Sequence, residues 1–502
     1  MRRNIGRLSM AFGAGSALPL AFAPYNYPAL GLLCLTVLFW LWDGARAKSA
    51  AVTGFVFGLG MFGFGVSWVQ ISVHQFGLPI YSFSVAVTAA FILALCCYPA
   101  ICGYSVAKLP GSNRFLRILC LFPMGWVLTE ILRGWLFTGF PWLLVGYSQV
   151  DAPLAVFAPI IGAYGVSYIT ALLAAAAVVS LRARGGWRYG ALGLVGFIAV
   201  TAITLNDVSW TQEAGEEMSV ALVQGAIPQA VKWSPAYRQP TIDLYTELSK
   251  PHWGKSLIVW PETAIPAFAG EIPDTLSVLA AKALESGTSL LVGMPTEDPT
   301  GGNEYFNSVV QFGTKSGRYN KHHLVPFGEY LPFDKWVRPL TTFLRIPMSD
   351  FSSGNFEQPL MLVGGYAIGV SICYEDAYAD VVARALPQAN VLVNVSNDAW
   401  FGDSIAPHQH LQIARMRALE TERYLLRATN TGISAIVDDR GKVVVASKQF
   451  VSDVVSADIT PRSGLTPAAK YGRTSIIVLN LLLFAIYILP SWGRNKSSTP
   501  SH

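Results

Sequence analysis

The sequence predicts a polytopic α-helical membrane bundle, with about eight transmembrane helices, that carries a layered α/β domain. Three observations lead to this prediction. Of the 502 residues, 52% are hydrophobic and only 13% are charged, a balance typical of membrane proteins. Up to residue 206 the only acidic residues are Asp43, Glu130 and Asp151, and almost all the others lie between 207 and 458. Short strand-like runs fill that charged part, so we expect two domains in two solvents.

Eight apolar runs are long enough, or nearly long enough, to cross a bilayer, which takes ~20 residues. The fourth run is the longest, and we expect it to tilt or break near Pro99. The first run has a signal peptide as its alternative, with Ala23 at the cleavage site. Because Pro24 would then follow the cut, we interpret this run as a helix. The runs are 8–24, 27–42, 51–72, 78–107, 115–133, 160–181, 187–206 and 475–490.

Lysine and arginine residues set the orientation of the runs. With the N-terminus in the cytoplasm, the inside segments are basic and the outside loops hold almost no basic residue except Arg133. This bias accounts for the net charge of +5, so we expect no nucleic-acid partner. The expected location is the bacterial inner (cytoplasmic) membrane, multi-pass. The predicted domains are an N-terminal membrane domain of seven transmembrane helices (1–206), a periplasmic catalytic domain (207–474), and a C-terminal transmembrane helix with a short cytoplasmic tail (475–502).

The charged part is predicted to be an α/β or α+β domain, because short runs rich in Val, Ile and Leu alternate with helical stretches. Two helices are predicted, at 274–286 and at 408–427. The predicted strands are 219–224, 256–260, 289–293, 308–312, 367–372, 391–395, 434–437 and 443–446.

Reactive side chains follow these strands. Cys373 follows the strand 367–372, where open α/β sheets place their chemistry, although a buried free cysteine acting as a small hydrophobe is the alternative. Glu262 follows a strand and a proline, and burial there would raise its pKa and suit a general base; a helix cap is the alternative. Lys321 would favour a thiolate and stabilise an oxyanion, unless it is a plain surface lysine.

Other kinds of site are less consistent with the pattern. Cys373 is the only cysteine in the charged part, so it has no disulfide partner within its own domain. The adjacent residues His322 and His323 would point to opposite faces of a strand, so we expect no metal and no cofactor. A Cys–His–Asp protease site that recruits His408 or His410 is a rival, but no protease signature accompanies it.

Taken together, WPE at 260–262, YNKHHLVPFGEY at 319–330 and CYE at 373–375 resemble the carbon–nitrogen hydrolase (nitrilase) superfamily. With a multi-helix membrane domain in front and one helix behind, essentially the whole chain resembles the bacterial apolipoprotein N-acyltransferase family. Ala226 departs from the family pattern, in which Asn is more frequent, and this departure would loosen a turn near the site. Further matching segments are RGWLFTGFPW at 133–142, GYSQ at 146–149, QG at 224–225, KW at 232–233 and SNDAWFG at 396–402.

The resemblance implies a nitrilase-like α-β-β-α sandwich and a role for each matching residue. Glu262 would be the general base and acid, Lys321 would stabilise the oxyanion, and Cys373 would be the nucleophile. Glu329 would hold the lysine. Arg133 is expected to meet a lipid phosphate, the alternative being a plain interfacial pair with Glu130. The other supporting or substrate-binding residues are Trp233, Tyr374, Glu375 and Trp400.

The implied activity is acyl transfer from a phospholipid, with phosphatidylethanolamine as the expected donor, through a Cys373 thioester. The acceptor would be the free α-amino group of the S-diacylglyceryl cysteine of an apolipoprotein, the last step of bacterial lipoprotein maturation, with ping-pong kinetics. The alternative is a membrane-tethered nitrilase-type amidase acting on a soluble amide. A transporter with a sensor domain is weaker, because only Glu130 and Arg133 offer paired charges within a span. We expect a monomer.

The segment 336–351 follows Glu329 and mixes large apolar side chains with Arg338 and Arg345. Its prolines prevent a long helix. We predict a mobile lid over Cys373 that guides acyl chains from the bilayer, with ordinary cover of the sandwich as the alternative.

Overall fold

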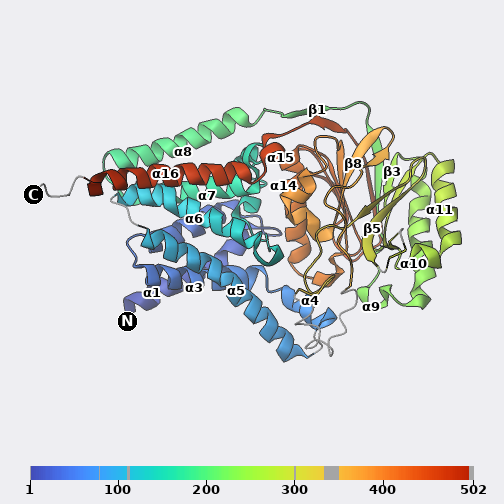
Figure 1. Cartoon of the computed structure of the whole chain (residues 1–502), viewed down its shortest axis with the longest axis horizontal. Coiled ribbons are helices and arrows are strands. Elements are labelled where there is room, and N and C mark those ends of the chain that lie inside the picture. Colours follow the sequence, from blue (N-terminus) through green and yellow to red (C-terminus); the bar gives the residue numbers. More distant parts are fainter. Residues whose placement is uncertain are drawn as a thin grey trace, which may run out of the picture. The chain divides into compact units, whose positions relative to one another are not determined.

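The computed structural model describes residues 2–77, 80–109, 113–298, 301–302, 304–332 and 350–496 (Figure 1). These residues form two compact units. The first contains the described residues of 1–69, 85–208 and 471–502, and the second those of 70–84 and 209–470. The sequence assigns 70–84 to the membrane domain, whereas the structure groups this segment with the second unit. The predicted lid at 336–351 lies outside the described residues, apart from its last two positions.

Helices occupy all eight apolar runs in the first unit. Among the described residues, α3, α5, α6, α8 and the stretch 153–182 that includes α7 are long and apolar enough to span a membrane, whereas α2 and the apolar part of α16 are shorter. The first run differs from its prediction, because α1 ends at Ala17 and a 3-10 turn containing Pro19 follows. The helices are α1 (Arg2–Ala17), α2 (Pro28–Trp42), α3 (Ala47–Gly65), α5 (Tyr81–Lys108), α6 (Arg114–Arg133), α7 (Ala158–Arg182), α8 (Gly186–Leu205) and α16 (Thr474–Lys496).

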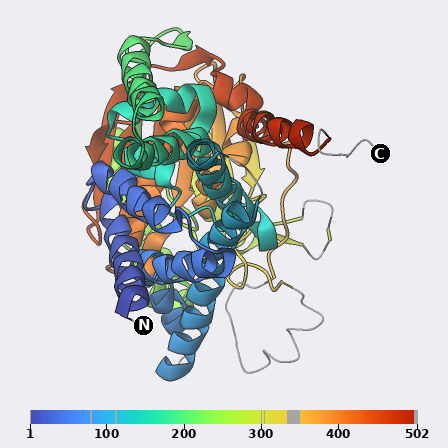
Figure 2. The same ribbon diagram turned by 90° about the vertical axis from the view of Figure 1, so that its left-hand side faces the viewer.

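Helix α7 organises this unit, since it packs against α2, α6, α8 and α16 (Figure 1, Figure 2). Its run of small residues at 174–176 is fully buried, which lets neighbouring backbones approach closely. Helix α8 instead exposes Phe197, Val200 and Ile203 along one side. Such an apolar surface is stable in lipid and unstable in water, so this unit is a membrane bundle.

The second unit is built from two six-stranded sheets within its described residues. Their orders are β13-β2-β3-β4-β5-β6 and β12-β11-β10-β9-β8-β7. Pairing is parallel within β2-β3-β4 and within β8-β9-β10, and antiparallel elsewhere. The strands are β2 (Met218–Gln224), β3 (Leu257–Val259), β4 (Ser289–Glu297), β5 (Tyr305–Phe312), β6 (Gly317–Asn320), β7 (Met361–Val363), β8 (Tyr366–Ile372), β9 (Val391–Ser396), β10 (Leu425–Thr429), β11 (Ala435–Val437), β12 (Val443–Ala446) and β13 (Asp453–Ile459); β1 (Thr211–Glu213) pairs separately with β14 (Arg462–Gly464).

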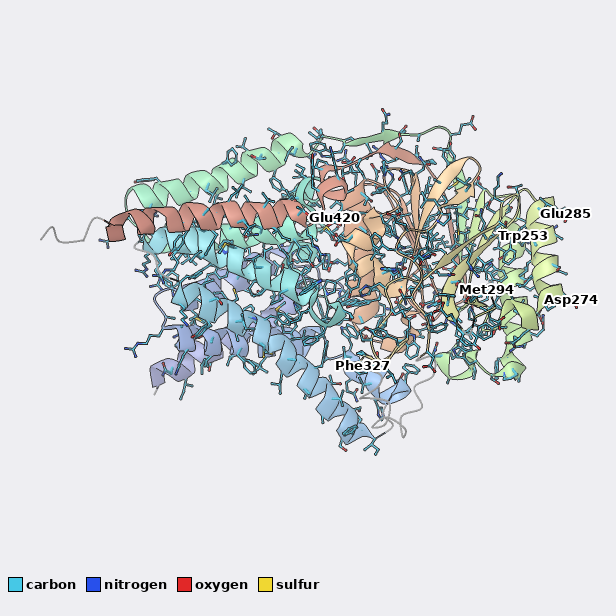
Figure 3. All side chains as sticks on the ribbon, viewed as in Figure 1. Trp253, Asp274, Glu285, Met294, Phe327 and Glu420 are labelled. Carbon is cyan, nitrogen blue, oxygen red and sulfur yellow. The ribbon has the colours of Figure 1, made fainter. Side chains whose placement is uncertain are left out.

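Alternating side chains place a hydrophobic core between the sheets and another behind each sheet. In β2, Val220 and Leu222 join the central core, whereas Ala221 and Val223 pack beneath the helices of the first sheet. Those helices are α10 (Pro235–Ser249) and α11 (Pro273–Glu285), and α13 (Ala379–Ala383) with α14 (Ala406–Thr421) covers the second sheet. Figure 3 labels Asp274 and Glu285 on the outer helix α11 and Met294 on β4 beneath it. The layers are therefore α-β-β-α, as the resemblance implies.

The predicted helix 408–427 is wrong in its last part. Helix α14 ends at Thr421, Glu422 has a φ of +46°, and 425–429 forms strand β10. The Glu422 carboxylate accepts hydrogen bonds from the backbone N–H groups of Trp210 (2.8 Å) and Thr211 (2.9 Å), which fixes the turn. Pairing with β9 and full burial outweigh the helical preference of the segment.

The described residues of 70–84 form a short arm of the second unit, which includes all but the first residue of α4 (Val69–Phe76) and the start of α5. The Ser72 hydroxyl donates to the Trp400 carbonyl (2.6 Å), and the Phe76 ring meets the Trp400 ring edge to face at 4.5 Å. His74 contacts Tyr81 in the same way, at 5.4 Å. Trp400 thus anchors a segment that is more than 300 residues away in the chain.

Candidate active site

The three predicted catalytic residues meet between the two sheets. Cys373 directly follows β8, Glu262 follows β3 after Trp260 and Pro261, and Lys321 directly follows β6. The Lys321 Nζ atom lies 3.6 Å from Glu262 Oε1, and the charges of both groups act on the Cys373 thiol. All three side chains are buried, so a reaction here would proceed largely away from water.

Cys373 has an unusual backbone conformation. Its φ is +53°, and it begins the 3-10 turn η8 (Cys373–Ala377). A left-handed residue with a side chain costs ~1–2 kcal/mol, so the surrounding contacts must hold it in place. The Asn394 amide provides one such contact, donating to the Cys373 carbonyl (3.2 Å). The thiol is thereby presented at a sharp strand-to-turn junction.

The surroundings of Cys373 keep its sulfur protonated at rest. Burial raises the pKa of Cys373 well above its ordinary value, the Glu262 charge raises it further, and the Lys321 charge opposes both. The resting group is therefore a thiol. Glu262 Oε1 accepts a hydrogen bond from the Asn307 amide (2.7 Å), whereas Oε2 has no hydrogen-bond partner among the residues that the structure describes. That free oxygen is available to accept a proton.

Lys321 is held as a cation. Burial lowers its pKa, but the carboxylates of Glu329 and Glu262 more than offset this, and the net pKa shift is upward. Its Nζ donates to Glu329 Oε1 (2.8 Å), and its backbone N–H donates to the Asn307 carbonyl (2.8 Å). A fixed buried ammonium of this kind stabilises negative charge that develops on a substrate oxygen.

Glu329 and Asn307 link Glu262 to Lys321. Glu329 Oε1 accepts from Lys321 and from the Asn307 amide (2.9 Å), and Oε2 accepts from the Val325 N–H (2.8 Å). Because Asn307 Nδ2 donates to both Glu262 and Glu329, it sets the spacing of the two carboxylates. The sequence analysis missed Asn307, although a buried polar residue in the apolar strand β5 is a usable signal.

Lys232 is a second buried lysine that the sequence analysis did not assign to the site. Its Nζ donates to the Glu262 carbonyl (3.1 Å), and the side chain is 1% exposed. Burial lowers the pKa of Lys232 to about 8, against the opposing charges of Glu262 and Cys373. The adjacent Trp233 is 38% exposed, so its ring remains accessible beside the site.

From within the core, Glu375 supports the turn that begins at Cys373. Its carboxylate accepts hydrogen bonds from the Tyr319 hydroxyl and from the backbone N–H groups of His322, His323 and Ile372, all between 2.7 and 3.0 Å. Burial raises the pKa of Glu375 to about 7, while these donors oppose the rise. The side chain is fully buried, so it positions the turn and does not face a substrate.

The remaining predicted residues lie in different surroundings. Tyr374 packs its ring against Tyr378 at 5.2 Å, and Trp400 packs against the 70–84 arm. Arg133 requires a correction, because it is 2% exposed and its guanidinium donates to the carbonyls of Phe140 (2.9 Å) and Trp142. It therefore holds the loop that follows α6 and is not placed to meet a lipid phosphate.

The rival arrangement of a thiol with a histidine base is not favoured by the geometry. The His410 ring lies between two carboxylates, with Nε2 2.9 Å from Asp376 and Nδ1 2.9 Å from Asp398. Neither ring nitrogen is left to accept a proton from Cys373. His408 contacts Gln449 through its Nε2 (3.0 Å).

An α-β-β-α sandwich with Glu, Lys and Cys at its strand ends, in one chain with a membrane bundle, defines a membrane-embedded protein of the carbon–nitrogen hydrolase class. Residues 219–467 match the family model described as carbon-nitrogen hydrolase. Residues 14–176 match the family model described as apolipoprotein N-acyltransferase N-terminal domain.

Relatives of full length narrow this class to one family. An apolipoprotein N-acyltransferase of Methylococcus capsulatus is 44% identical over 499 residues, covering 98% of this chain and 97% of the relative. The Nitrosomonas europaea protein of that name is 42% identical over 504 residues, which cover 98% of this chain and 99% of the relative. An amidase of the nitrilase superfamily from Nesterenkonia has 19% identity and a TM-score of 0.39, over 52% of this chain and 97% of that one. The chain belongs to the apolipoprotein N-acyltransferase family.

Proposed function

We propose that this protein transfers an acyl chain from a phospholipid to the α-amino group of a diacylglyceryl-modified apolipoprotein, through a thioester on Cys373. The observation that carries the proposal is the buried Cys373 at a strained turn, with the free Glu262 oxygen and the Lys321 ammonium acting on it. The full-length relatives named apolipoprotein N-acyltransferase favour this activity over hydrolysis of a soluble amide.

The first half-reaction forms the thioester. Glu262 Oε2 takes the proton from the Cys373 thiol, and the sulfur attacks the ester carbonyl carbon of the phospholipid. The Lys321 ammonium stabilises the oxyanion of the tetrahedral intermediate. The carbon–oxygen ester bond then breaks, Glu262 returns the proton to the leaving alkoxide, and a lysophospholipid departs.

The second half-reaction forms the amide. The neutral amine of the acceptor attacks the thioester carbonyl, and Lys321 again stabilises the oxyanion. Glu262 removes a proton from the attacking nitrogen, the carbon–sulfur bond breaks, and the thiol regains a proton from Glu262. Burial of all three side chains disfavours water as the competing acceptor.

The environment of the reaction is part of the proposal. We infer phosphatidylethanolamine as the donor, the bacterial inner membrane as the location, and the periplasmic side for the catalytic domain. The regular placement of basic residues between the apolar runs supports this orientation. We also propose that the protein acts as a monomer, with domains at 1–206, 207–474 and 475–502, the first of which supplies the 70–84 arm of the second structural unit.

Mass spectrometry of the purified full chain tests the proposal. After incubation in detergent with phosphatidylethanolamine, the peptide that contains Cys373 should gain the mass of one fatty acyl group. Adding a peptide with an N-terminal S-diacylglyceryl cysteine should remove that mass and yield an N-acylated peptide. The exposed Cys97 provides a matched control, since Cys97→Ser should react normally and Cys373→Ser not at all. Turnover of phospholipid without an acylated Cys373 would contradict the mechanism.

A further inference from the structure

Four charged side chains are buried behind the nucleophile turn, and the proposed reaction uses none of them. Asp376, Asp398, His410 and Arg427 are each at most 1% exposed, and we call them the charged cluster. They come from η8, the 3-10 turn η9 (Asp398–Phe401), α14 and β10. Four buried charges are costly to fold around unless each is closely paired.

Each carboxylate of the charged cluster meets both cations. His410 Nε2 is 2.9 Å from Asp376 Oδ1, and Nδ1 is 2.9 Å from Asp398 Oδ1. The Arg427 guanidinium donates to Asp376 Oδ2 (2.9 Å) and to Asp398 Oδ2 (3.1 Å). Gly432 closes over Asp398, because a Cβ at that position would lie 2.3 Å from the carboxylate.

The proton on His410 decides the charge of the cluster. With the imidazolium, two anions balance two cations; with the neutral ring, one negative charge is left. Nδ1 also lies 2.8 Å from an Arg427 nitrogen, so the charged ring is repelled by Arg427. In the neutral ring, the nitrogen without a proton faces a carboxylate oxygen, that of Asp398 or that of Asp376 according to the tautomer. Burial and the charge of Arg427 lower the pKa of His410. The charges of Asp376 and Asp398 raise it by more, so the net pKa is about 9.

Two contacts connect the cluster to the nucleophile. Asp376 belongs to the turn that begins at Cys373. Arg427 also donates to Asn394 Oδ1 (2.7 Å), which orients the amide so that Nδ2 can donate to Ser371 Oγ (3.0 Å) and to the Cys373 carbonyl. The cluster therefore holds both the carbonyl of the left-handed residue and the far end of its turn.

The cluster also sets the charge next to the thiol. Asp398 is among the groups that raise the pKa of Cys373, whereas the Lys321 ammonium lowers it. A neutral cluster adds little to the cost of forming a thiolate, whereas a cluster with one excess negative charge opposes it.

We propose that Asp376, Asp398, His410 and Arg427 act as a positioning cluster that fixes the Cys373 turn and, through the proton on His410, keeps the charge behind the thiol balanced while the thiolate forms. This inference rests on the proposed role of Cys373 as the nucleophile. It names no further group that touches the substrate.

The test measures alkylation of Cys373 by iodoacetamide between pH 5 and pH 10, read from the mass of the Cys373 peptide of the full chain in detergent. In His410→Asn the cluster keeps one excess negative charge, so alkylation at pH 7 should slow by about tenfold, the effect of one pKa unit on the thiolate fraction. His408→Asn, on the same helix, is the matched control and should react like the parent protein.

A compensating variant separates charge from packing. His410→Asn combined with Asp398→Asn leaves Arg427 balanced by Asp376, so most of the alkylation rate should return. Asp398→Asn alone should react at least as fast as the parent protein. The slowing expected in His410→Asn is a change that misfolding does not produce, because misfolding would expose the buried thiol and speed its alkylation. Equal slowing in the single and double variants, or slower alkylation in Asp398→Asn, would overturn the inference. If these responses hold but phospholipid never acylates Cys373, the proposed function fails and the cluster inference stands.

Discussion

Replacing Glu375 by Gln tests how firmly the nucleophile turn is held. The carboxylate accepts from four donors, and an amide has only one oxygen with which to do so. The least costly orientation keeps the oxygen towards the N–H groups of His322 and His323 and turns the NH₂ towards the N–H of Ile372. That N–H belongs to the residue before Cys373, so the damage falls on the turn itself.

The expected magnitude follows from these contacts. Above pH 7, where Glu375 is ionised, the glutamine variant loses one hydrogen bond to a charged group, worth ~1.5–3 kcal/mol, and an unpaired buried N–H adds ~1–3 kcal/mol. We expect a loss of about 3–5 kcal/mol of unfolding free energy in the second unit, and a lower Tm. A small displacement of the sulfur should slow acylation of Cys373 on the order of a hundredfold.

Thermal unfolding of the purified protein in detergent and the rate of Cys373 acylation would measure both effects. Glu357→Gln is the control, because Glu357 is an exposed side chain of the same kind. If Glu375→Gln unfolds within one or two degrees of the parent protein and acylates within about twofold of it, the carboxylate does not hold the turn and the reasoning is wrong.

Three further predictions follow from other contacts. Asn307→Ala should slow acylation of Cys373 at least tenfold in the mass assay, because Glu262 loses the amide that orients it; an unchanged rate would show that the amide is dispensable. Ala226→Gly should raise the Tm and spare acylation, since Ala226 has a φ of +54° and glycine relieves ~1 kcal/mol there; a lower Tm would contradict this. Since burial raises the pKa of Glu375 from 4.5 to about 7, the folded state binds one more proton between these values. The unfolding free energy of the second unit should therefore fall as pH rises from 4.5 to 7, and Glu375→Gln should flatten that slope.

The sequence predicts the parts of the site that depend on local pattern. Strand β8 alternates and stops at Cys373, and β3 is a continuous apolar run that ends shortly before Glu262, so both strand ends can be located without a structure. The sequence does not predict strand β10, whose residues fall within the predicted helix 408–427. Burial between β9 and β11 determines the conformation of this segment, and no local pattern indicates that burial. The sequence therefore does not predict which residues contact Arg427.

Side chains that act through distant contacts could not be predicted in this way. Asn307 orients two carboxylates that come from other elements, and no spacing in the sequence reveals this. The sequence predicts Arg133 at a lipid surface, because Arg133 lies at the outer end of an apolar run and aromatic residues follow it. In the structure, the loop that follows α6 covers Arg133, and backbone carbonyls of that loop accept hydrogen bonds from its guanidinium.

The arm at 70–84 changes what a minimal catalytic fragment must contain. The chain crosses between the two units at 69/70, 84/85, 208/209 and 470/471, so the second unit is not one continuous piece of sequence. A secreted fragment of 209–470 would lose the Ser72 hydroxyl and the Phe76 ring, uncovering the ring of Trp400. Cleavage by a protease near 208 would likewise leave the arm joined to the helices on both sides. A soluble version of this enzyme therefore needs the arm grafted back by a linker.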